Sequence, residues 1–573
     1  MSENLEKERE RIIRLLNESS DKELSDTDDV SSDDFVEPSE HETETEEEAD
    51  ISEDELPIEN NNLLLGKDST TTWSKKEPRP NVRTPKRNII SEKPGFKGRK
   101  DSIKSPIDCF RLFFDREVIN TITACTNLQI QKVGANYSRA RDTRPTDEVE
   151  IECFIGLLLF AGTNRSGRQN IKDLWDRDGL GVEIFYASMN YQRFRFLLQC
   201  LRFDDINSRA QRKTMDKLAP IRQLFEMLVR KFQDNYVMSE YTTVDEQLVG
   251  FRGRCSFRQY LPNKPARYGI KIFALVDSNV FYTYNLEVYA GSQPEGPYKV
   301  DNTPKEVVRR LVEPISGTWR NVTVDNWFTS VPLAEYMLQS KLTLVGTLKK
   351  NKRELPQQMV CTKQREVNSS LFGFRKNMTI LSYVPKKGKN VILLSTMHSS
   401  MRIDSSTGDK KKPEIISFYN ATKGGVDTVD EMCVTYSVSR NANRWPMVIF
   451  FHLINVVGIN SFVIHNNINP GSKMYRSKFL REIARELVKS FIRRRAEMKM
   501  IPNELKRKTA YFADLSTLES ATKQRKGKSG RCVVCPRNKD MKTKLFCCSC
   551  NNWMCASHMV YICKDCKENS KDH

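Results

Sequence analysis

Three aspartates each follow an apolar, β-branched run in this chain, and that pattern restricts the possible folds more than any other feature. The runs end at Asp245, Asp325 and Asp427. The end of a strand holds a side chain more rigidly than a loop does, and a hard cation such as Mg²⁺ requires several carboxylates at fixed positions. Singly, each aspartate could equally form a turn or cap a helix. The three together predict a strand-based fold that gathers carboxylates around a metal ion.

A fourth carboxylate belongs to the same prediction. Asp430 lies three residues after Asp427, and both follow a Gly-Gly pair. If a helix begins at these glycines, residues three apart share one of its faces, and both carboxylates can reach one site. Glu246 is left out of the predicted site, because a continuing strand would turn its side chain to the face opposite Asp245.

The charge of the chain indicates nucleic acid as its partner. Residues 1–60 hold 24 acidic and five basic residues, whereas the whole 573-residue chain carries a net charge of +18, so the remaining residues carry +37. A balance this basic is usual for proteins that neutralise phosphates. An anionic membrane is the alternative, but neither end of the chain shows a basic amphipathic helix or a lipidation signal, and the acidic N-terminus lacks the apolar region of a secretory signal. We expect an intracellular DNA-binding protein with no membrane partner.

The domain organisation follows from changes in sequence texture. Residues 1–93 are acidic, then basic and proline-containing, and are expected to be disordered. The later boundaries lie where the sequence pattern changes. Apolar residues at helical spacing are followed by β-branched and aromatic runs, then by a Lys-rich stretch and a second helical pattern. The longest apolar stretch, 445–464, contains His452, Asn455 and Asn460, which favour a buried core helix over a membrane span. The predicted segments are a tail at 1–93, a helical domain in two parts at 94–240 and 437–504, a strand-rich domain in two parts at 241–348 and 415–436, an insertion at 349–414, a linker at 505–530 and a cysteine-rich domain at 531–573.

The cysteine-rich segment predicts two zinc sites. Eight of the fifteen cysteines lie within the last 42 residues, and seven of them form, with His558, four pairs whose members are separated by two residues. Such pairs can supply eight ligands to two tetrahedral Zn²⁺ ions, and a segment this small needs metal to fold. A disulfide framework is disfavoured without a secretory signal. If the pairs interleave, the first ion is bound by Cys532, Cys535, Cys555 and His558, and the second by Cys547, Cys550, Cys563 and Cys566. Cys548 is then left over, and the position of the histidine differs from the RING and PHD orders, which disfavours a ubiquitin ligase or a histone reader.

Several longer strings in the chain resemble the piggyBac transposase family. They are Asp245-Glu246-Gln247-Leu248 with Gly250-Phe251-Arg252-Gly253-Arg254, Pro262-Asn263-Lys264-Pro265, Tyr268-Gly269-Ile270-Lys271, Asp325-Asn326-Trp327-Phe328-Thr329-Ser330, Asn351-Lys352-Arg353-Glu354, Thr422-Lys423-Gly424-Gly425-Val426-Asp427 and Asn443-Arg444-Trp445-Pro446. The resemblance covers roughly residues 106–573. It implies an α+β multidomain chain, with a ribonuclease H-like catalytic core, an insertion domain, a helical dimerisation and DNA-binding domain formed from two segments, and a C-terminal cross-brace double-zinc domain.

The same resemblance implies a metal-dependent, cut-and-paste DNA transposase. In this expectation Asp245, Asp325 and Asp427 hold two Mg²⁺ ions, with Mn²⁺ as a possible substitute, and Asp430 is a further catalytic member. Two metal ions of this kind clamp the attacking and leaving oxygens of a displacement at phosphorus. The implied partners are double-stranded DNA, as transposon terminal inverted repeats and a TTAA target, and a second or further copy of the chain. Excision would pass through hairpin intermediates, in the nucleus. The alternatives are a domesticated, transposon-derived nuclear DNA-binding protein without mobilising activity, and a zinc-module adaptor with an unrelated central fold.

Four residues are candidate DNA contacts. Arg444 and Trp445 follow the carboxylate segments and could grip DNA or stack on it, although Trp445 could equally be a core residue. Lys349 and Lys352 lie where the chain leaves the strand-rich domain and could meet phosphate, although each could equally be a solvated surface charge.

Overall fold

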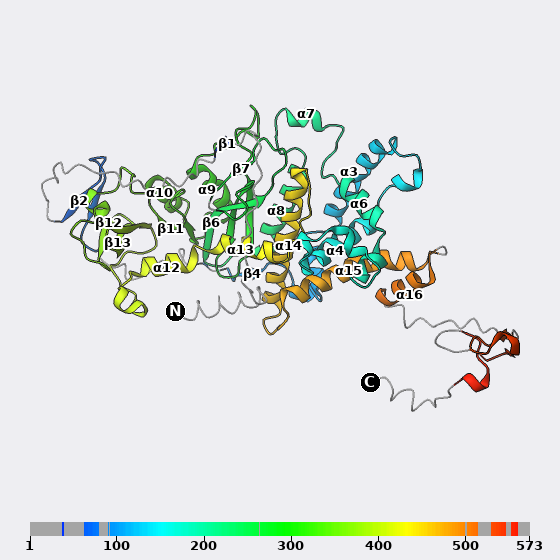
Figure 1. Cartoon of the computed structure of the whole chain (residues 1–573). Helices are drawn as coiled ribbons and strands as arrows, with labels where there is room; N and C mark the ends of the chain where they lie inside the picture. Colours follow the sequence, from blue (N-terminus) through cyan, green and yellow to red (C-terminus); the bar gives the residue numbers. More distant parts are fainter. Residues whose placement is uncertain are drawn as a thin grey trace. The chain divides into compact units, whose positions relative to one another are not determined.

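The computed structural model describes residues 37–38, 62–78, 90, 92–262, 264–498, 501–513, 529–545 and 552–559. The chain divides into two compact units, Met1–Phe491 and Ile492–His573, and each is described by itself (Figure 1).

A mixed β-sheet organises the first unit. Among the described residues its strands run in the order β1-β7-β8-β6-β10-β11-β14-β13-β12-β3-β2, and β9 pairs with β8 outside this path. The strands on the β8 side are β1 (Glu37–Pro38), β7 (Gln259–Tyr260), β8 (Tyr268–Asp277), β9 (Thr283–Val288) and β6 (Tyr241–Gly250). The others are β10 (Asn321–Val324), β11 (Thr343–Thr347), β14 (Lys389–Ser395), β13 (Met378–Lys386), β12 (Ser370–Arg375), β3 (Thr72–Ser74) and β2 (Leu63–Leu65). The β-branched runs of the sequence therefore form strands, as predicted.

The register between β6 and β10 sets the geometry of the candidate site. The two strands are parallel, and Val244 lies opposite Val324 at the last paired position. All four residues of β10 are buried, as are Thr242, Thr243 and Val244 of β6. Asp245 and Asp325 each follow directly after this buried pairing, so the sheet delivers the two aspartates to the same edge.

The predicted insertion extends the same sheet. β14 pairs antiparallel with β11, and β13 and β12 continue the sheet outward. A common hydrophobic core joins them, formed by Val345, Phe372, Phe374, Leu381, Tyr383, Leu393, Ile415 and Ile416. The last two belong to α12 (Glu414–Thr422), which contacts β6 and β11. Residues 349–414 are thus an extension of the sheet by hairpins that share a core with their neighbours.

Part of the N-terminal tail is ordered, and the prediction of disorder throughout 1–93 was wrong for residues 62–78. β2 and β3 form a hairpin, and Ser74 of β3 pairs with Phe374 of β12. Trp73 is completely buried and Leu64 nearly so. The acidic and basic composition of the tail as a whole concealed this short apolar segment, whose buried side chains offset the entropy of ordering it.

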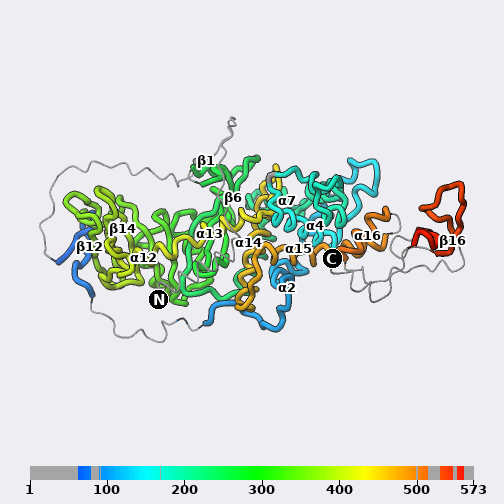
Figure 2. The backbone as a smooth tube through the Cα atoms, turned by 60° about the horizontal axis from the view of Figure 1, so that its bottom comes forward, coloured from blue at the N-terminus to red at the C-terminus, as the bar shows by residue number. Residues whose placement is uncertain are grey.

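Helices from both ends of the predicted helical domain pack together. They are α2 (Pro106–Arg111), α3 (Arg116–Gly134), α4 (Glu148–Thr163), α5 (Glu183–Ser188), α6 (Tyr191–Cys200), α7 (Arg209–Lys213), α8 (Arg222–Asn235), α14 (Trp445–Ile468) and α15 (Arg476–Ala496). The ring of Phe450 on α14 contacts those of Phe114 and Phe203. Figures 1 and 2 both place α14 between the strands of the sheet and the helices of residues 106–200.

α14 is long and apolar enough to cross a membrane, but 94% of its most apolar window is buried inside the protein. The side chain of Asn460 is fully buried there and exchanges two hydrogen bonds with the backbone of Thr283, at 2.8 and 2.9 Å. The prediction of a core helix is confirmed, because the protein itself satisfies the polar groups that a bilayer would leave unpaired.

Smaller elements complete the two units. In the first unit these are β4 (Gly95–Phe96), β5 (Tyr236–Val237), α9 (Pro304–Val312), α10 (Val331–Gln339), α11 (Gln357–Val360) and α13 (Gly425–Thr435). In the second they are α16 (Asn503–Phe512), β15 (Gly530–Arg531) and β16 (Lys542–Thr543). The predicted linker at 505–530 was wrong for the residues of α16, which is ordered by the burial of Leu505 and Thr509.

Candidate active site and metal centres

Asp245 and Asp325 meet, and Glu246 joins them. Asp325 directly follows the end of β10, as predicted, whereas Asp245 and Glu246 lie within β6, just beyond its last pair with β10. Carboxylate oxygens of Asp245, Glu246 and Asp325 all lie within 4.8 Å of one another. Leaving Glu246 out of the site was therefore wrong. β10 ends at Val324, so beyond Val244 one edge of β6 has no parallel neighbour, and side chains from either face can turn into the space. The Asp245 carboxylate also folds back, because its Oδ1 accepts a hydrogen bond from the Glu246 backbone N–H at 2.8 Å.

Asp325 serves both the turn and the cluster. Its Oδ1 accepts hydrogen bonds from the backbone N–H groups of Trp327 at 3.0 Å and Phe328 at 3.2 Å. The pKa of this carboxyl is raised to about 7, chiefly by burial and also by the nearby charge of Asp245, whereas the two N–H donors and Lys349 act to lower it. The sequence left open whether Asp325 forms a turn or belongs to the site, and its side chain does both.

The cluster favours a bound cation. Burial raises the pKa of Asp245 well above its usual range, and the neighbouring carboxylates of Glu246 and Asp427 raise it too, while Lys264 lowers it. The pKa of Glu246 is also raised, first by burial and then by Asp325. Like charges in a buried site repel, and a divalent cation removes that repulsion. Because the donors are all carboxylate oxygens, the set fits Mg²⁺ rather than a soft metal.

The third aspartate lies on α13, which begins at Gly425 as predicted. Asp427 is in the first turn of that helix, its side chain is 64% exposed, and its Oδ1 lies 3.2 Å from Lys264 Nζ. The same ammonium group donates to the carbonyl oxygen of Glu246 at 3.2 Å. Asp427 therefore borders the three-carboxylate group and is connected to it through Lys264. The sequence analysis quoted the string that contains this lysine but gave it no role.

Asp430 lies deeper on the same helix. Burial raises the pKa of its carboxyl to about 7, Lys264 lowers it, and the charges of Asp427 and Asp245 raise it. The helical spacing thus brings both carboxylates of α13 into the field of Asp245, and Asp430 is the more buried of the two.

Buried hydroxyl groups fix α12 and α13 to the sheet behind the carboxylates. Thr243 Oγ1 donates to the carbonyl oxygen of Thr422 at 2.6 Å, and the hydroxyls of Thr323 and Thr422 lie 2.7 Å apart. A Cβ atom at Gly425 would lie 2.8 Å from Thr243 Oγ1, closer than real Cβ atoms come. A glycine at position 425 is therefore required for the close approach of α13 to β6.

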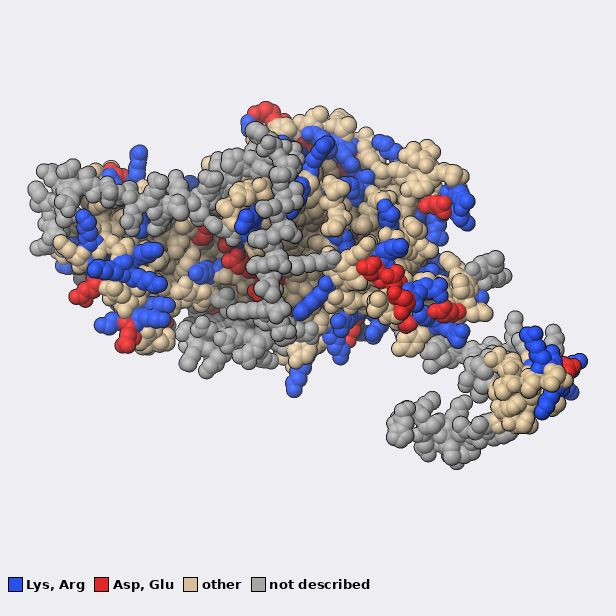
Figure 3. Space-filling model, in the orientation of Figure 1, with Lys and Arg blue, Asp and Glu red and all other residues tan. Residues whose placement is uncertain are grey.

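The four candidate DNA contacts differ in their surroundings. Lys349 and Lys352 are half-buried in the segment that leaves β11, and Lys349 is close enough to Asp325 to influence its pKa. Figure 3 shows further Lys and Arg side chains gathered at the end of this unit that holds β12 and β13. A positive surface of this kind suits a polyanion.

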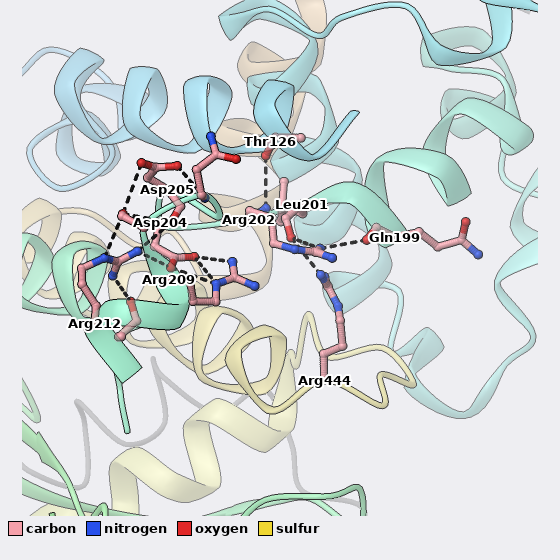
Figure 4. Close-up of polar contacts among 12 residues, drawn as sticks. Thr126, Gln199, Leu201, Arg202, Asp204, Asp205, Arg209, Arg212 and Arg444 are labelled. Carbon is pink, nitrogen blue, oxygen red and sulfur yellow. Dashed lines mark hydrogen bonds and ion pairs between the residues drawn. The ribbon is translucent and has the colours of Figure 1, made fainter. Parts of the chain in front are cut away.

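Arg444 and Trp445 instead make contacts within the protein. Figure 4 shows the Arg444 guanidinium directed at the end of α6, where it donates to the carbonyl oxygens of Leu201 at 3.1 Å and Leu198 at 3.3 Å. A cation is stabilised at a helix C-terminus by its unpaired carbonyls and by the helix dipole. The Trp445 ring packs edge-on against Phe257, with centroids 5.0 Å apart. The contact of Trp445 matches its alternative as a core residue, and the described hydrogen bonds of Arg444 are made within the protein.

Figure 4 also shows two arginines that share one carboxylate, near the contact of Arg444 with α6. Arg209 and Arg212 both pair with Asp204, which is almost fully buried. Because one carboxylate serves two guanidinium groups, this cluster braces the connection between α6 and α7.

In the second unit, the four residues predicted for the first zinc site lie together. Atoms of Cys532, Cys535, Cys555 and His558 lie within 4.8 Å of one another, and His558 Nδ1 is 3.3–3.5 Å from each sulfur. Three thiolates and one imidazole are a usual ligand set for tetrahedral Zn²⁺. The first and third pairs of the segment are thus adjacent, as interleaving requires. The second predicted site, Cys547, Cys550, Cys563 and Cys566, lies outside the described residues.

The chain matches known transposases. The transposase IS4 family matches residues 105–462, a span that contains all four aspartates. A piggyBac transposase, solved by cryo-electron microscopy as a synaptic complex with hairpin DNA, is similar with a TM-score of 0.71 and 36% identity, over 83% of this chain and 100% of that chain. Human PiggyBac transposable element-derived protein 3 is 23% identical over 370 residues, 61% of this chain and 60% of its own length. Human PiggyBac transposable element-derived protein 2 is 20% identical over 408 residues, 69% of this chain and 66% of its own length. The matches thus cover less than two thirds of either human protein.

Proposed function

Because the chain belongs to the transposase IS4 family and is a piggyBac-like transposase, we propose that it is an active enzyme that cuts and joins DNA. In this proposal it binds the terminal inverted repeats of a transposon, excises the element through hairpin intermediates and inserts it at TTAA sites. The observation that carries the proposal is the group of three carboxylates on neighbouring strands, with Asp245 and Glu246 in β6 and Asp325 directly after β10, bordered by Asp427 and Asp430.

The residues have distinct tasks in this reaction. Asp245, Glu246 and Asp325 would hold Mg²⁺, and Mn²⁺ could replace it. When bound, such ions activate water or a 3′-hydroxyl and neutralise charge that develops at phosphorus. Lys264 holds Asp427 at the border of the site, and the buried threonine hydroxyls fix the helix that carries it. Lys349, next to Asp325, is placed to meet a DNA phosphate.

DNA is the proposed partner, and the strong positive charge of residues 61–573 supports it. The similar solved transposase is a synaptic complex with hairpin DNA, which favours a homodimer or larger assembly of this chain on DNA. We place that assembly in the nucleus, because its substrate is chromosomal. Two structural Zn²⁺ ions complete the proposed cofactors, and the four clustered ligands of the first site support them.

A domesticated DNA-binding protein is the second candidate. It is favoured by the human relatives, which are named as transposable element-derived proteins and are matched over only part of their length. Against it stands the complete set of aspartates. Inverted repeats ending in TTAA on either side of the gene would favour an active element.

An excision assay tests the proposal directly. A plasmid carrying the cognate terminal repeats is incubated with the protein and Mg²⁺, and the broken ends and rejoined donor sites are sequenced. Substitutions Asp245→Ala, Asp325→Ala and Asp427→Ala should each reduce cleavage by more than about 100-fold, since even residues that only support metal ligands contribute about 10- to 100-fold. Asp101→Ala, at an exposed position, is the matched control. Cleavage that survives the three substitutions would refute the metal site, and absence of cleavage by the intact protein would favour the domesticated alternative.

A further inference from the structure

The N-terminal hairpin contacts the segment that carries two of the candidate DNA-binding lysines. We name residues 349–356, which follow β11, the lysine loop. Two backbone hydrogen bonds join the turn of the hairpin to this loop: Lys67 N–H donates to the Leu355 carbonyl at 3.2 Å, and Asp68 N–H donates to the Arg353 carbonyl at 2.9 Å. Gly66 also forms an isolated bridge with Pro356.

Two side chains of the hairpin reach the same loop. The indole Nε1–H of Trp73 donates to the Glu354 carbonyl at 3.0 Å, and Lys67 Nζ donates to the Lys350 carbonyl at 3.0 Å. The hairpin thus binds four carbonyl groups of an eight-residue loop. Trp73 is 0% exposed, so its hydrogen bond is made from a fixed position. A Cβ atom at Gly66 would lie 3.0 Å from the Glu354 carbonyl oxygen, so the two segments lie in close contact.

The loop has few regular contacts of its own. Within it, Lys352 N–H and Leu355 N–H donate to the carbonyls of Lys349 and Lys352, both at 3.3 Å. Its N-terminal end is anchored beside the site, because Leu348 N–H donates to Ile392 of β14 at 2.8 Å. The hairpin supplies the anchor at the other end. Asn351 and Arg353 are exposed, and Lys349 and Lys352 are half-buried.

We propose that the hairpin of residues 62–78 is a positioning element, anchored by Trp73, that holds Lys349 and Lys352 ready to bind the phosphates of duplex DNA beside Asp325. A loop ordered in advance does not have to lose its conformational freedom when DNA binds. The DNA contact rests on the proposed function, whereas the effect of the hairpin on the loop does not. This gives a segment outside the matched family region, 105–462, a role in DNA binding.

Hydrogen exchange on the full-length protein tests the first step. In Trp73→Ala, the amides of residues 349–355 should exchange faster, and those of β6 should not change. The matched control is Leu63→Ala on the same hairpin, whose side chain is 48% exposed. If Trp73→Ala fails to fold, Trp73→Phe keeps a buried aromatic ring and removes the N–H donor to Glu354. Unchanged exchange in the lysine loop of a folded variant would overturn the proposal.

The salt dependence of DNA affinity tests the second step. The probe is a fluorescein-labelled duplex of arbitrary sequence. Each phosphate contact contributes about 0.9 to the slope of log affinity against log salt, so removal of both lysines should reduce that slope by about 1.8. Trp73→Ala should reduce it in the same direction, and a triple variant should match the double lysine variant, because the hairpin acts through the lysines.

Additive effects of Trp73→Ala and the lysine substitutions would overturn the proposal, as would a lysine pair whose removal leaves the slope unchanged. Neither measurement needs strand cleavage. If the intact protein failed to cut a terminal-repeat plasmid while the exchange and salt results held, the proposed enzymatic function would fail and the positioning role would stand.

Discussion

Lys264 Nζ lies 3.2 Å from Asp427 Oδ1 and 3.2 Å from the carbonyl oxygen of Glu246. One ammonium group therefore joins the strand that carries Asp245 to the helix that carries Asp427. The side chain of Asp427 is largely exposed, and its contact with Lys264 connects it to the site.

Replacing Lys264 by methionine should lower two parameters, the maximum rate of strand cleavage and the Mg²⁺ concentration that the reaction needs. The maximum rate of strand cleavage should fall by about 10- to 100-fold, as for other residues that orient metal ligands. The Mg²⁺ concentration needed for half-maximal rate should fall as well, because the site becomes more negative. Cleavage measured across a Mg²⁺ series separates the two effects. Lys264→Arg, which keeps the charge, is the control, and a higher Mg²⁺ requirement at an unchanged maximum rate would contradict the assignment.

The stability of the protein in EDTA should fall as pH rises from about 4 to about 7. Burial raises the folded-state pKa of Asp325 from 3.8 to about 7. Between these values the folded state binds more protons than the unfolded state, so this contribution to stability is complete below 3.8 and is lost as pH rises through about 7. Thermal unfolding of the intact protein and of Asp325→Asn, followed by circular dichroism, should show a shallower pH dependence in the variant. Parallel curves would argue against the raised pKa.

Mg²⁺ should reverse this trend. The carboxylates must lose their protons to bind metal, so the increase in melting temperature caused by Mg²⁺ should grow between pH 6 and pH 8. The gain should be absent in Asp325→Asn, and an equal gain in that variant would place the ion elsewhere.

Arg444→Met should weaken folding more than DNA binding. The variant leaves the Leu198 carbonyl at the end of α6 without its charged partner, while the Leu201 carbonyl keeps a hydrogen bond from Arg202 at 2.8 Å. The free energy of unfolding should therefore fall by about 1–3 kcal/mol. The slope of log DNA affinity against log salt should stay the same. Urea denaturation and duplex titrations measure the two quantities, and a slope reduced by about 0.9 at unchanged stability would restore Arg444 as a phosphate contact.

Cys555→Ser should release one of the two zinc ions expected per chain. The substitution removes a ligand from the first predicted site, while the second site uses other residues. Metal analysis of the purified protein measures the loss, and Asn552→Ala, at an exposed position of the same segment, is the control. A chain that keeps its full zinc content after Cys555→Ser would exclude this ligand set.

Asn460→Leu should destabilise the first unit. Its two hydrogen bonds to Thr283 join α14 to the start of β9, and their loss leaves backbone groups unpaired in the core, at a cost of about 1–3 kcal/mol for each. Asn466→Leu, half-buried on the same helix, provides the comparison in urea denaturation. Equal stability of the two variants would mean that water replaces the lost contacts.

The sequence predicted those parts of the site that depend on local pattern. The runs before Asp245 and Asp325 form buried parallel strands, and the Gly-Gly pair begins the helix of Asp427 and Asp430. Alternation along a strand failed at Glu246, because the rule assumes neighbours on both sides of the strand and the pairing with β10 ends two residues earlier, at Val244. Local pattern cannot predict such a missing neighbour.

Contacts between residues far apart in the chain could not be predicted from local sequence pattern either. Lys264 comes from a loop between β7 and β8 and reaches Asp427 across more than 160 residues of chain. Trp73 lies 281 residues from Glu354, within a tail whose average composition predicts disorder. No periodicity or composition carries information about either pairing, which depends on how distant segments pack.

The return of β14 alongside β11 has a practical consequence. The chain leaves the sheet after β11, at Leu348, and returns beside β11 along β14, before α12 begins. The conformation of the segment between β11 and β14 therefore does not set the position of Asp427. Gly388, with a φ of 77°, lies in the turn between β13 and β14, on this outward excursion. A fluorescent reporter spliced into that turn would leave the carboxylates undisturbed and would let the protein be followed in living cells.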